Sequence, residues 1–405
     1  MFDFDLPVDR RGTYSMKWDD DGYFKKMVSG IRLDNETVRI MLADNDFRCP
    51  PAITAAMHRV ADFPNYGYTT ADSAPMFRTS VCDWYRKRYD TEVSEESIVY
   101  VSGALDGVGR TITAFSQEGD GVIICRPVYS NFTSTIKGLG RQVVNVPLIN
   151  EECGKYEMDW ENFEKACAEE TNKVYVLCSP ANPIGKVWTK EELCRMAEIC
   201  RKNNVVLVSD EIHSDLTRQG VKNIPVVKAV EDLSNIILVS GANKTFNIMG
   251  LHCAYCIIPD EKLRADFESR GSSQMPTPFA LAAQIAAYEE CDEWLDEFVK
   301  YTDENMQQTA DLIREKLPLA KVYIPEGTYV LWVDFSGYGM TPKQIQYLIN
   351  HRANVCVQNG TAHDPENGGQ YLRICVTSPK AVMKEAIEKI ADAFQYIDFA
   401  KENVK

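Results

Sequence analysis

A single lysine, Lys244, follows the point where an apolar run ends. The run is IILV (236–239), and the lysine lies within SGANKTFNIMGL (240–251), where a helix could begin. An ammonium group at the end of a buried strand loses hydration, which costs several kcal/mol unless the group is paired or its pKa falls. Lys244 therefore either turns to water, the commoner outcome for one lysine taken alone, or takes part in chemistry.

Four other polar clusters also follow apolar runs directly. With the lysine cluster they are SGALDG (102–107), RPVYSNF (126–132), SPANPIG (179–185), SDEIH (209–213) and SGANK (240–244). In an open α/β sheet, ligands bind outside the carboxyl ends of the strands. We therefore expect these five clusters to meet in space, although any one of them is a weak signal alone.

The first cluster supplies a phosphate site. It leads from a strand into a helix, so the backbone N–H groups near Gly103, Ala104 and Leu105 could hold a phosphate at a helix N-terminus.

The other clusters supply groups for a flat, charged ring. Asp210 ends an apolar strand and needs a cationic partner, such as a protonated ring nitrogen. Tyr129 could stack on the ring, Asn182 could donate to a ring oxygen, and Lys244 could form a Schiff base. Together these are the requirements of pyridoxal 5′-phosphate.

Taken singly, the same residues have commoner explanations. Asp210 could cap a helix, His213 could be a satisfied core histidine, and Tyr129 could be a core or interface aromatic. Arg373 alone would more often form a structural ion pair. The chemical interpretation therefore depends on the whole set meeting at the strand ends.

The elements that position these residues are short apolar runs separated by helical segments. The runs are SIVYV (97–101), GVIIC (121–125), VYVLC (174–178), VVLVS (205–209) and NIILVS (235–240). Runs without polar alternation are typical of strands buried on both faces, and the intervening helices imply parallel crossovers. In the helix of TKEELCRMAEICRKNN, Thr189 is the expected N-cap and Glu192 completes a capping box. The pattern predicts a doubly wound α/β domain.

Beyond residue 290 the pattern changes. A long charged helix (292–317) precedes a strand in GTYVLWVDF, a helix near 342–352, a strand in YLRICV and a final helix. We expect a large domain over 46–290, a smaller α+β domain over 291–405, and an N-terminal segment, 1–45, that packs with the small domain.

The composition of the chain indicates which kinds of partner it is expected to bind. The 405 residues carry a net charge of −15, which disfavours nucleic acid and anionic membranes and favours a small-molecule substrate. The N-terminus, MFDFDLPVDRRG, lacks the apolar stretch of a signal peptide, and no window has about 18 consecutive apolar residues. Thirteen cysteines without a secretory signal indicate reduced thiols, so we expect a cytoplasmic protein.

One Cys-x-x-Cys sequence, Cys253 to Cys256, could suggest a redox or zinc site. It lies in the strand-like LHCAYCIIP, where positions three apart face opposite sides, and no second pair follows. We therefore expect structural cysteines and no metal.

Several motifs resemble one known family. They are DRRGTYSMKWD (9–19), LADNDF (42–47), NYGYTT (65–70), SPANPIGKVWTKEEL (179–193), SDEIHSDL (209–216), NKTFNIMGL (243–251) and PEGTYVLWVDF (325–335). In these the chain resembles fold-type I pyridoxal-phosphate enzymes, and more closely the MalY/PatB group of cystathionine β-lyase-like C–S lyases within the aminotransferase class I/II family. The resemblance covers nearly the whole chain.

The resemblance implies a role for each residue of the site. Lys244 would carry the cofactor, Asp210 would pair with its ring nitrogen, and Tyr129 would stack on the ring. Arg373 would bind the substrate α-carboxylate. The remaining implied contacts are Gly103, Ala104, Leu105 and Ser240 to the phosphate, Asn182 and His213 to the O3′ side of the ring, Ala43 and Asn182 to the substrate, and Tyr68 to the cofactor of the other subunit of a homodimer.

The chain departs from the family pattern at four places. Gly241 and His252 stand where many fold-type I enzymes have a phosphate-binding serine and arginine, and Ser240 and Thr245 are the candidate substitutes. Asn45 replaces a frequent methionine, and the loop GTAHDPENGG (360–369) differs from the usual Phe-Gly loop.

The resemblance implies a C–S β-lyase that cleaves L-cystathionine or L-cysteine-type substrates to a thiol, pyruvate and ammonia. An aminotransferase needs the same lysine, aspartate and arginine, so the residues leave that alternative open. A regulatory or binding protein that holds the cofactor with little turnover is a third possibility, against which the intact Lys244, Asp210 and Arg373 count.

Overall fold

The fold is known from a computed structural model, which describes residues 2–28, 31–152, 154–271 and 274–404. Its centre is a seven-stranded sheet in the order β2-β10-β9-β8-β7-β3-β4. These strands are β2 (Ile98–Val101), β3 (Gly121–Ile124), β4 (Gln142–Asn145), β7 (Asn172–Cys178), β8 (Val206–Asp210), β9 (Ile236–Ser240) and β10 (Ala254–Ile257). Each of the five predicted strands is present. Neighbours from β4 to β9 pair in parallel, whereas β10 runs antiparallel to both β9 and β2.

The apolar strands are buried on both faces because helices cover both. On β9, Ile237 and Val239 pack in one cluster with the inner face of α5 (Ala104–Phe115), while Ile236 and Leu238 pack in another with α8 (Lys190–Lys202). Successive side chains of a strand point to opposite faces, so an unbroken apolar run is what this burial requires.

The sequence prediction for α8 is confirmed in detail. The Thr189 hydroxyl accepts from the Glu192 N–H at 3.2 Å, and the Glu192 carboxylate accepts from the Thr189 N–H at 2.9 Å. This capping box begins the helix at the predicted residue.

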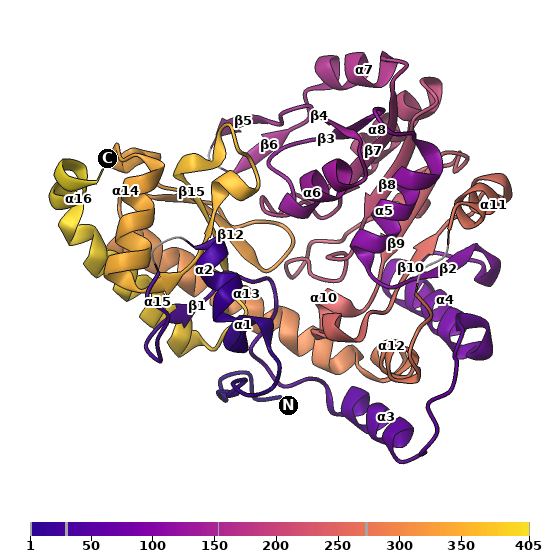
Figure 1. Ribbon diagram of the computed structural model, residues 1–405, viewed down its shortest axis with the longest axis horizontal. Coiled ribbons are helices and arrows are strands. Elements are labelled where there is room, and N and C mark those ends of the chain that lie inside the picture. The colour runs from indigo at the N-terminus through magenta and orange to yellow at the C-terminus, as the bar shows by residue number, and fades with distance from the viewer. Residues whose placement is uncertain (1, 29–30, 153, 272–273, 405) are drawn as a thin grey trace.

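The second sheet has four antiparallel strands in the order β11-β12-β15-β14. Its strands are β11 (Lys321–Val322), β12 (Val330–Asp334), β14 (Gln358–Asn359) and β15 (Tyr371–Cys375). The helices in this part of the chain include α13 (Asp292–Lys316), α14 (Pro342–Tyr347) and α15 (Lys380–Ala393). In Figure 1 this sheet lies to the left of the large one, with α14, α15 and α16 (Ile397–Asn403) at the outer edge. The two-residue strand β1 (Val38–Arg39) pairs in parallel with β13 (Val355–Cys356), which ties the N-terminal segment to this part of the chain.

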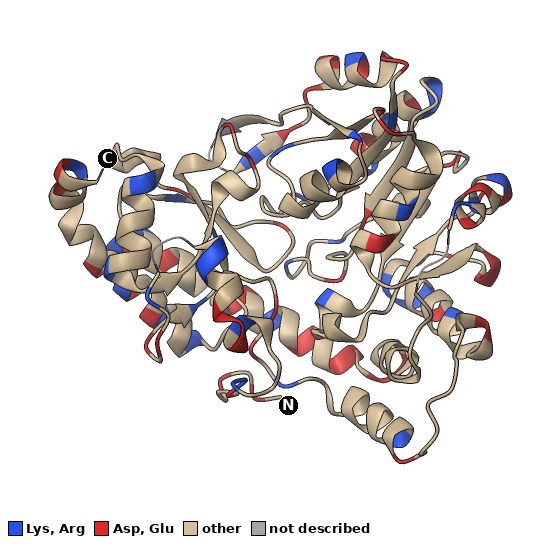
Figure 2. Cartoon of the chain, in the orientation of Figure 1, with Lys and Arg blue, Asp and Glu red and all other residues tan. Residues whose placement is uncertain are grey.

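The remaining elements cover the two sheets. They are α1 (Met16–Asp19), α2 (Asp21–Met27), α3 (Pro51–Ala61), α4 (Met76–Tyr89), α6 (Ser130–Gly138), the hairpin β5 (Ile149–Glu152) and β6 (Lys155–Glu157), α7 (Trp160–Ala168), α9 (Val226–Ala229), α10 (Asn243–Phe246), α11 (Glu261–Ser269) and α12 (Pro278–Glu290). Acidic and basic residues are scattered over the outer helices and loops, while the central strands carry few charged residues (Figure 2). Within the described ranges, none of the helices is both long and apolar enough to cross a bilayer. The predicted fold class, a doubly wound α/β sheet with a smaller α+β part, is confirmed.

Candidate active site

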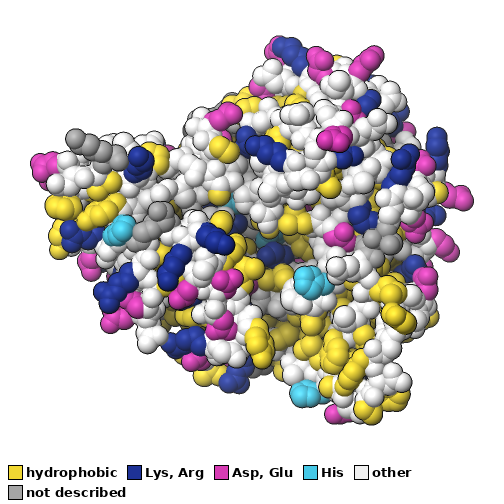
Figure 3. All heavy atoms as spheres, in the orientation of Figure 1, with side chains coloured by type: hydrophobic (Ala, Val, Ile, Leu, Met, Phe, Trp, Pro, Cys, Tyr) yellow, Lys and Arg dark blue, Asp and Glu magenta, His cyan; other side chains and the backbone are white. Residues whose placement is uncertain are grey.

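The predicted clusters meet at one cavity of about 730 Å³ at the carboxyl ends of the large-sheet strands. Figure 3 shows the molecule hollowed near its centre, where basic and histidine side chains gather. The predicted site residues that line the cavity are Ala43, Gly103, Ala104, Leu105, Tyr129, Asn182, Asp210, His213, Lys244 and Arg373. These residues are up to 330 positions apart in sequence, so the fold brings together what spacing alone could not.

Lys244 lies on α10, immediately beyond the end of β9. Its Nζ donates to the carbonyl oxygen of Ala43 at 2.6 Å. Burial lowers the pKa of Lys244, although the negative charge of Asp44 opposes this effect. A lysine whose ammonium form is disfavoured is more readily available as a neutral amine, the form that both a nucleophile and a base require.

Asp210 is the last residue of β8 and is almost completely buried. One carboxylate oxygen accepts from the Ile212 N–H at 3.2 Å. Burial raises the pKa of Asp210 to about 6, while this hydrogen bond and the charge of Lys244 only partly counter the increase. A carboxylate held this way has a strong requirement for a cationic partner within the cavity.

Arg373 comes from β15 of the smaller sheet and is buried. Its Nη2 donates to the Met41 carbonyl at 2.8 Å, and its Nη1 contacts the Asn182 amide oxygen at 3.4 Å. Its Nε has no hydrogen-bond partner in the part of the chain that the structure describes. Burial lowers the pKa of Arg373, which makes an anion in the cavity a favourable ligand.

Two aromatic rings from segments that follow strands of the large sheet line the same cavity. His213 is buried, and its Nδ1 lacks a partner among the described residues. Burial, with the charges of Lys244 and Arg373, holds the pKa of His213 well below its usual value, so the ring is neutral. Burial raises the pKa of Tyr129, whose hydroxyl accepts from the Asn131 amide at 2.9 Å.

The predicted phosphate-binding backbone, at the start of α5, is not covered by other atoms at Gly103. Gly103 is the N-cap of α5, and a Cβ placed there would have no atom within 4 Å. The α5 N-terminus therefore presents its N–H groups to free space beside the cavity.

The structure does not bring Ser240 to the cavity. Its hydroxyl donates to the Glu211 carbonyl at 3.1 Å beneath the site, and Thr245, the other candidate substitute, donates to Asp215 at 2.8 Å. At Gly241 a Cβ would lie 3.0 Å from the Ala254 Cα, so close packing against β10 explains why glycine replaces the family serine. His252 does line the cavity.

Tyr68 also lies outside the cavity. Its side chain is 97% exposed on the loop between α3 and α4.

Several lining residues were not predicted from the sequence. Those with polar or charged side chains include Arg10, Tyr14, Tyr23, Asp44 and Gln358. Arg10, Tyr14 and Asp44 belong to the quoted motifs DRRGTYSMKWD and LADNDF, which were the available signal, but nothing in either motif alone shows that the two meet.

These groups fit pyridoxal 5′-phosphate. The buried carboxylate of Asp210 matches a protonated ring nitrogen, and the unpartnered His213 Nδ1 and the Asn182 amide match a ring oxygen. The open N-terminus of α5 matches a phosphate and Lys244 an aldehyde carbon. The buried guanidinium of Arg373, whose Nε lacks a partner among the described residues, matches the carboxylate of an amino acid.

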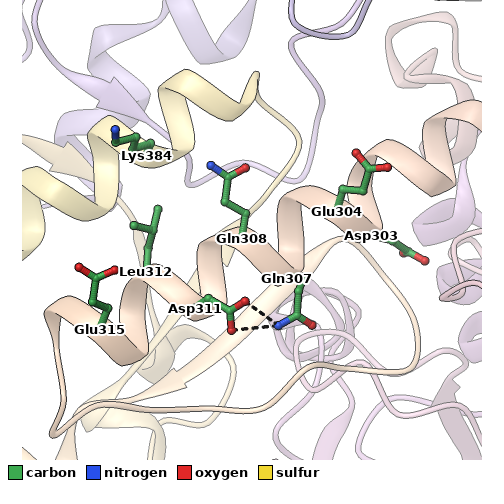
Figure 4. Close-up of a pocket in the computed structure, with 8 residues that line it drawn as sticks. All are labelled: Asp303, Glu304, Gln307, Gln308, Asp311, Leu312, Glu315 and Lys384. Atoms are coloured by element: carbon green, nitrogen blue, oxygen red, sulfur yellow. Dashed lines mark hydrogen bonds between the residues drawn. The ribbon is translucent and has the colours of Figure 1, made fainter.

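A second hollow lies outside this site, along α13 beside α15 (Figure 4). It is lined mainly by acidic and amide side chains, and Gln307 donates to both carboxylate oxygens of Asp311 at 2.9 and 3.0 Å. None of the predicted site residues lines it. Across the described chain, no group of three or more His, Cys, Asp or Glu side chains is arranged to hold a metal ion.

Known proteins are similar to this chain in sequence and in fold. Residues 39–390 match the family model of aminotransferase class I and II. Cystathionine β-lyase PatB of Bacillus subtilis (strain 168) is 33% identical over 394 residues, covering 96% of this chain and 99% of the relative. Cystalysin of Treponema denticola, which contains a pyridoxal 5′-phosphate cofactor, has a TM-score of 0.90 at 29% identity and covers 98% of this chain and 99% of its own. A pyridoxal-phosphate-bound C–S lyase of Staphylococcus hominis complexed with L-cycloserine has a TM-score of 0.90 at 32% identity, covering 97% and 98%.

Proposed function

This chain belongs to the aminotransferase class I and II family, and from that premise we propose that it is a pyridoxal 5′-phosphate-dependent C–S β-lyase. Its substrates are L-cystathionine or L-cysteine-type amino acids with sulfur at Cβ. The products are a thiol, pyruvate and ammonia, with one water consumed. The observation that carries the proposal is the meeting of Lys244, Asp210 and Arg373 at one cavity, in a chain similar over almost its full length to a cystathionine β-lyase.

We assign the cofactor contacts from this placement. Asp210 holds the ring nitrogen in its protonated form, and Asn182 and His213 bind the O3′ side. Tyr129 stacks on the ring. The N–H groups of Gly103, Ala104 and Leu105 bind the phosphate. When bound, the cofactor supplies an electron-withdrawing ring that takes up the negative charge developing at the substrate Cα.

The chain's own groups bind the substrate and move its proton. Arg373 binds the α-carboxylate with its planar guanidinium, which fixes the Cα–H bond relative to Lys244. The lowered pKa of Lys244 suits it to accept the Cα proton as a general base. The thiolate then leaves from Cβ, and Lys244, which now holds the Cα proton as an ammonium group, can return that proton to the departing sulfur.

We propose a homodimer in which Tyr68 reaches the cofactor of the other subunit. Apolar side chains are exposed around Tyr68, including Phe63, Tyr66 and Met76. Figure 3 shows hydrophobic side chains gathered at the lower right, where α3 lies in Figure 1. An exposed apolar surface of this kind is more consistent with an interface than with solvent.

We retain two sequence expectations as proposals. The chain divides into an N-terminal segment (1–45), a cofactor-binding domain (46–290) and a small domain (291–405). A cytoplasmic location is supported by the twelve described cysteines, all of which are free thiols.

The test is incubation of the purified protein with L-cystathionine, with and without a 2-oxo acid. Formation of pyruvate and homocysteine without the oxo acid is the expected result. Amino transfer that depends on the oxo acid would support an aminotransferase instead, and neither reaction would leave a binding protein as the explanation.

A further inference from the structure

Two cations from the N-terminal segment are held against a wall of the active site. The wall is the stretch 41–46, here called the site segment. Lys17 is only 1% exposed, and Arg10 is about one-fifth exposed. Removing a lysine ammonium from water costs several kcal/mol unless other groups compensate its charge, so the partners of Lys17 must offset this cost.

Both cations bind the same two carboxylates. Lys17 Nζ lies 2.7 Å from Asp46 Oδ2 and 3.7 Å from Asp44 Oδ1. Arg10 donates to Asp44 at 2.9 Å, to Asp46 at 3.1 Å and to the Asn45 carbonyl at 3.0 Å. The four side chains form a balanced cluster of two positive and two negative charges.

The pKa values of Lys17 and Asp46 reflect the attraction between these opposite charges. Burial lowers the pKa of Lys17, but the charges of Asp46 and Asp44 outweigh burial, and the net shift is upward. Burial raises the pKa of Asp46, but Lys17 and the hydrogen bond from Ser378 outweigh it, and the net shift is downward. Both shifts favour the charged forms of Lys17 and Asp46, so removing the lysine would leave a buried carboxylate without its closest cation.

The site segment in turn holds the residues that act on the substrate. The Met41 carbonyl accepts from Arg373 Nη2 at 2.8 Å. The Ala43 carbonyl accepts from Lys244 Nζ at 2.6 Å and from the Tyr329 hydroxyl at 3.1 Å. A movement of this segment would displace the acceptor that orients the guanidinium.

We propose that Lys17 and Arg10 are positioning residues of the active site, which act through the site segment to set the orientation of Arg373. Neither needs to touch the substrate carboxylate. The inference rests on the proposed function, because it assumes that Arg373 binds this carboxylate. A loss of the cations should thus weaken recognition of the carboxylate specifically, beyond any general loss of stability.

The test compares two amines added to the holoenzyme. L-alanine has an α-carboxylate and no leaving group, whereas ethylamine lacks the carboxylate. Each dissociation constant is measured from the change in visible absorption of the bound cofactor. The ratio of the ethylamine constant to the L-alanine constant reports how much the carboxylate contributes, and a merely unstable protein leaves this ratio unchanged.

Three variants use this ratio. Lys17→Met should lower it at least tenfold, because methionine keeps the length of the side chain and removes the charge. Lys17→Met/Asp46→Asn restores charge balance and should recover the ratio to within about threefold of wild type. Arg10→Gln, at a partly exposed position, should lower the ratio about threefold and serves if Lys17→Met does not fold. The matched control is Arg11→Gln, since Arg11 is half exposed and pairs with Asp9 outside the cluster.

An unchanged ratio in Lys17→Met, or in Arg10→Gln if the first variant is insoluble, would overturn the inference. A fall in Arg11→Gln as large as that in Arg10→Gln would also overturn it. A wild type that makes pyruvate from L-cystathionine but binds both amines equally would refute the role of Arg373, and with it this inference, while leaving the lyase activity established.

Discussion

Asp210→Asn should change two measurable quantities in opposite directions. It should make the cofactor-free protein more stable at neutral and alkaline pH, and it should weaken binding of the cofactor. Asparagine has nearly the same shape as aspartate and can still accept the hydrogen bond from Ile212, so the substitution mainly removes the charge.

The size of the stability effect follows from the burial of Asp210. Its pKa is raised from 3.8 to about 6, so the folded protein binds the proton more tightly than the unfolded chain does. For a carboxyl group shifted this way, stability is highest below pH 3.8, is lost as the pH rises to about 6, and is constant above that. The folding stability lost between these two pH values is about 3 kcal/mol. Asparagine avoids this loss.

The cofactor effect follows from the missing partner. A neutral amide cannot pair with a protonated ring nitrogen, and breaking a buried charge pair costs about 3 to 5 kcal/mol. At the lower end this corresponds to about a hundredfold weaker affinity. The cofactor that does bind should also be a poorer electron sink, so turnover should fall.

The assay is urea denaturation of the cofactor-free wild type and variant at pH 4 and pH 8, with cofactor affinity measured separately by equilibrium dialysis. We expect the variant to be more stable by about 3 kcal/mol at pH 8 and by little at pH 4. A variant and a wild type that are equally stable at pH 8, as well as at pH 4, would refute the effect of burying the Asp210 carboxylate. Undiminished cofactor affinity would refute the pairing with the ring nitrogen.

Three further predictions concern other parts of the site. Arg373→Lys should raise KM for amino acids far more than it weakens cofactor binding, because lysine cannot reproduce the planar two-point contact, and an unchanged KM would exclude the role. Burial raises the pKa of Glu211 to about 8, so the folded protein loses stability as the pH rises from 4.5 to that value. Glu211→Gln should therefore stabilise the protein against urea by several kcal/mol at pH 8 and by little at pH 4.5. A stabilisation of the same size at both pH values would contradict this. Inactive Tyr68→Ala and Lys244→Ala chains, refolded together, should regain about a quarter of wild-type activity, since half of the dimers are hybrids with one intact site. A mixture that stays inactive would place Tyr68 and Lys244 of one chain in the same site.

The sheet and the centre of the site were predictable because burial leaves a direct trace in sequence. Strands covered on both faces must be apolar throughout, so β9 is visible as IILVS and a lysine shortly after it is conspicuous. The direction of β10 was not predictable from its own residues. It runs antiparallel because the segment 241–253 returns the chain without a long crossover helix, and the same apolar run would serve a parallel strand.

Contacts between distant segments were the part that sequence could not show. Arg10 and Lys17 look like ordinary surface cations in DRRGTYSMKWD, and only the fold brings them to Asp44 and Asp46. Ser240 does not line the cavity for a similar reason, because its position at the end of β9 does not determine that its hydroxyl donates to the Glu211 carbonyl instead.

The role of Lys244 is tested by locating the lysine to which the cofactor is attached. The purified yellow protein is reduced with borohydride and digested, and the peptides are weighed by mass spectrometry. We expect the cofactor's mass on the peptide containing Lys244. We also expect Lys244→Ala, isolated with cofactor, to carry no covalent label and to produce no pyruvate from L-cystathionine. Label on another lysine, or a labelled and active Lys244→Ala variant, would contradict this role.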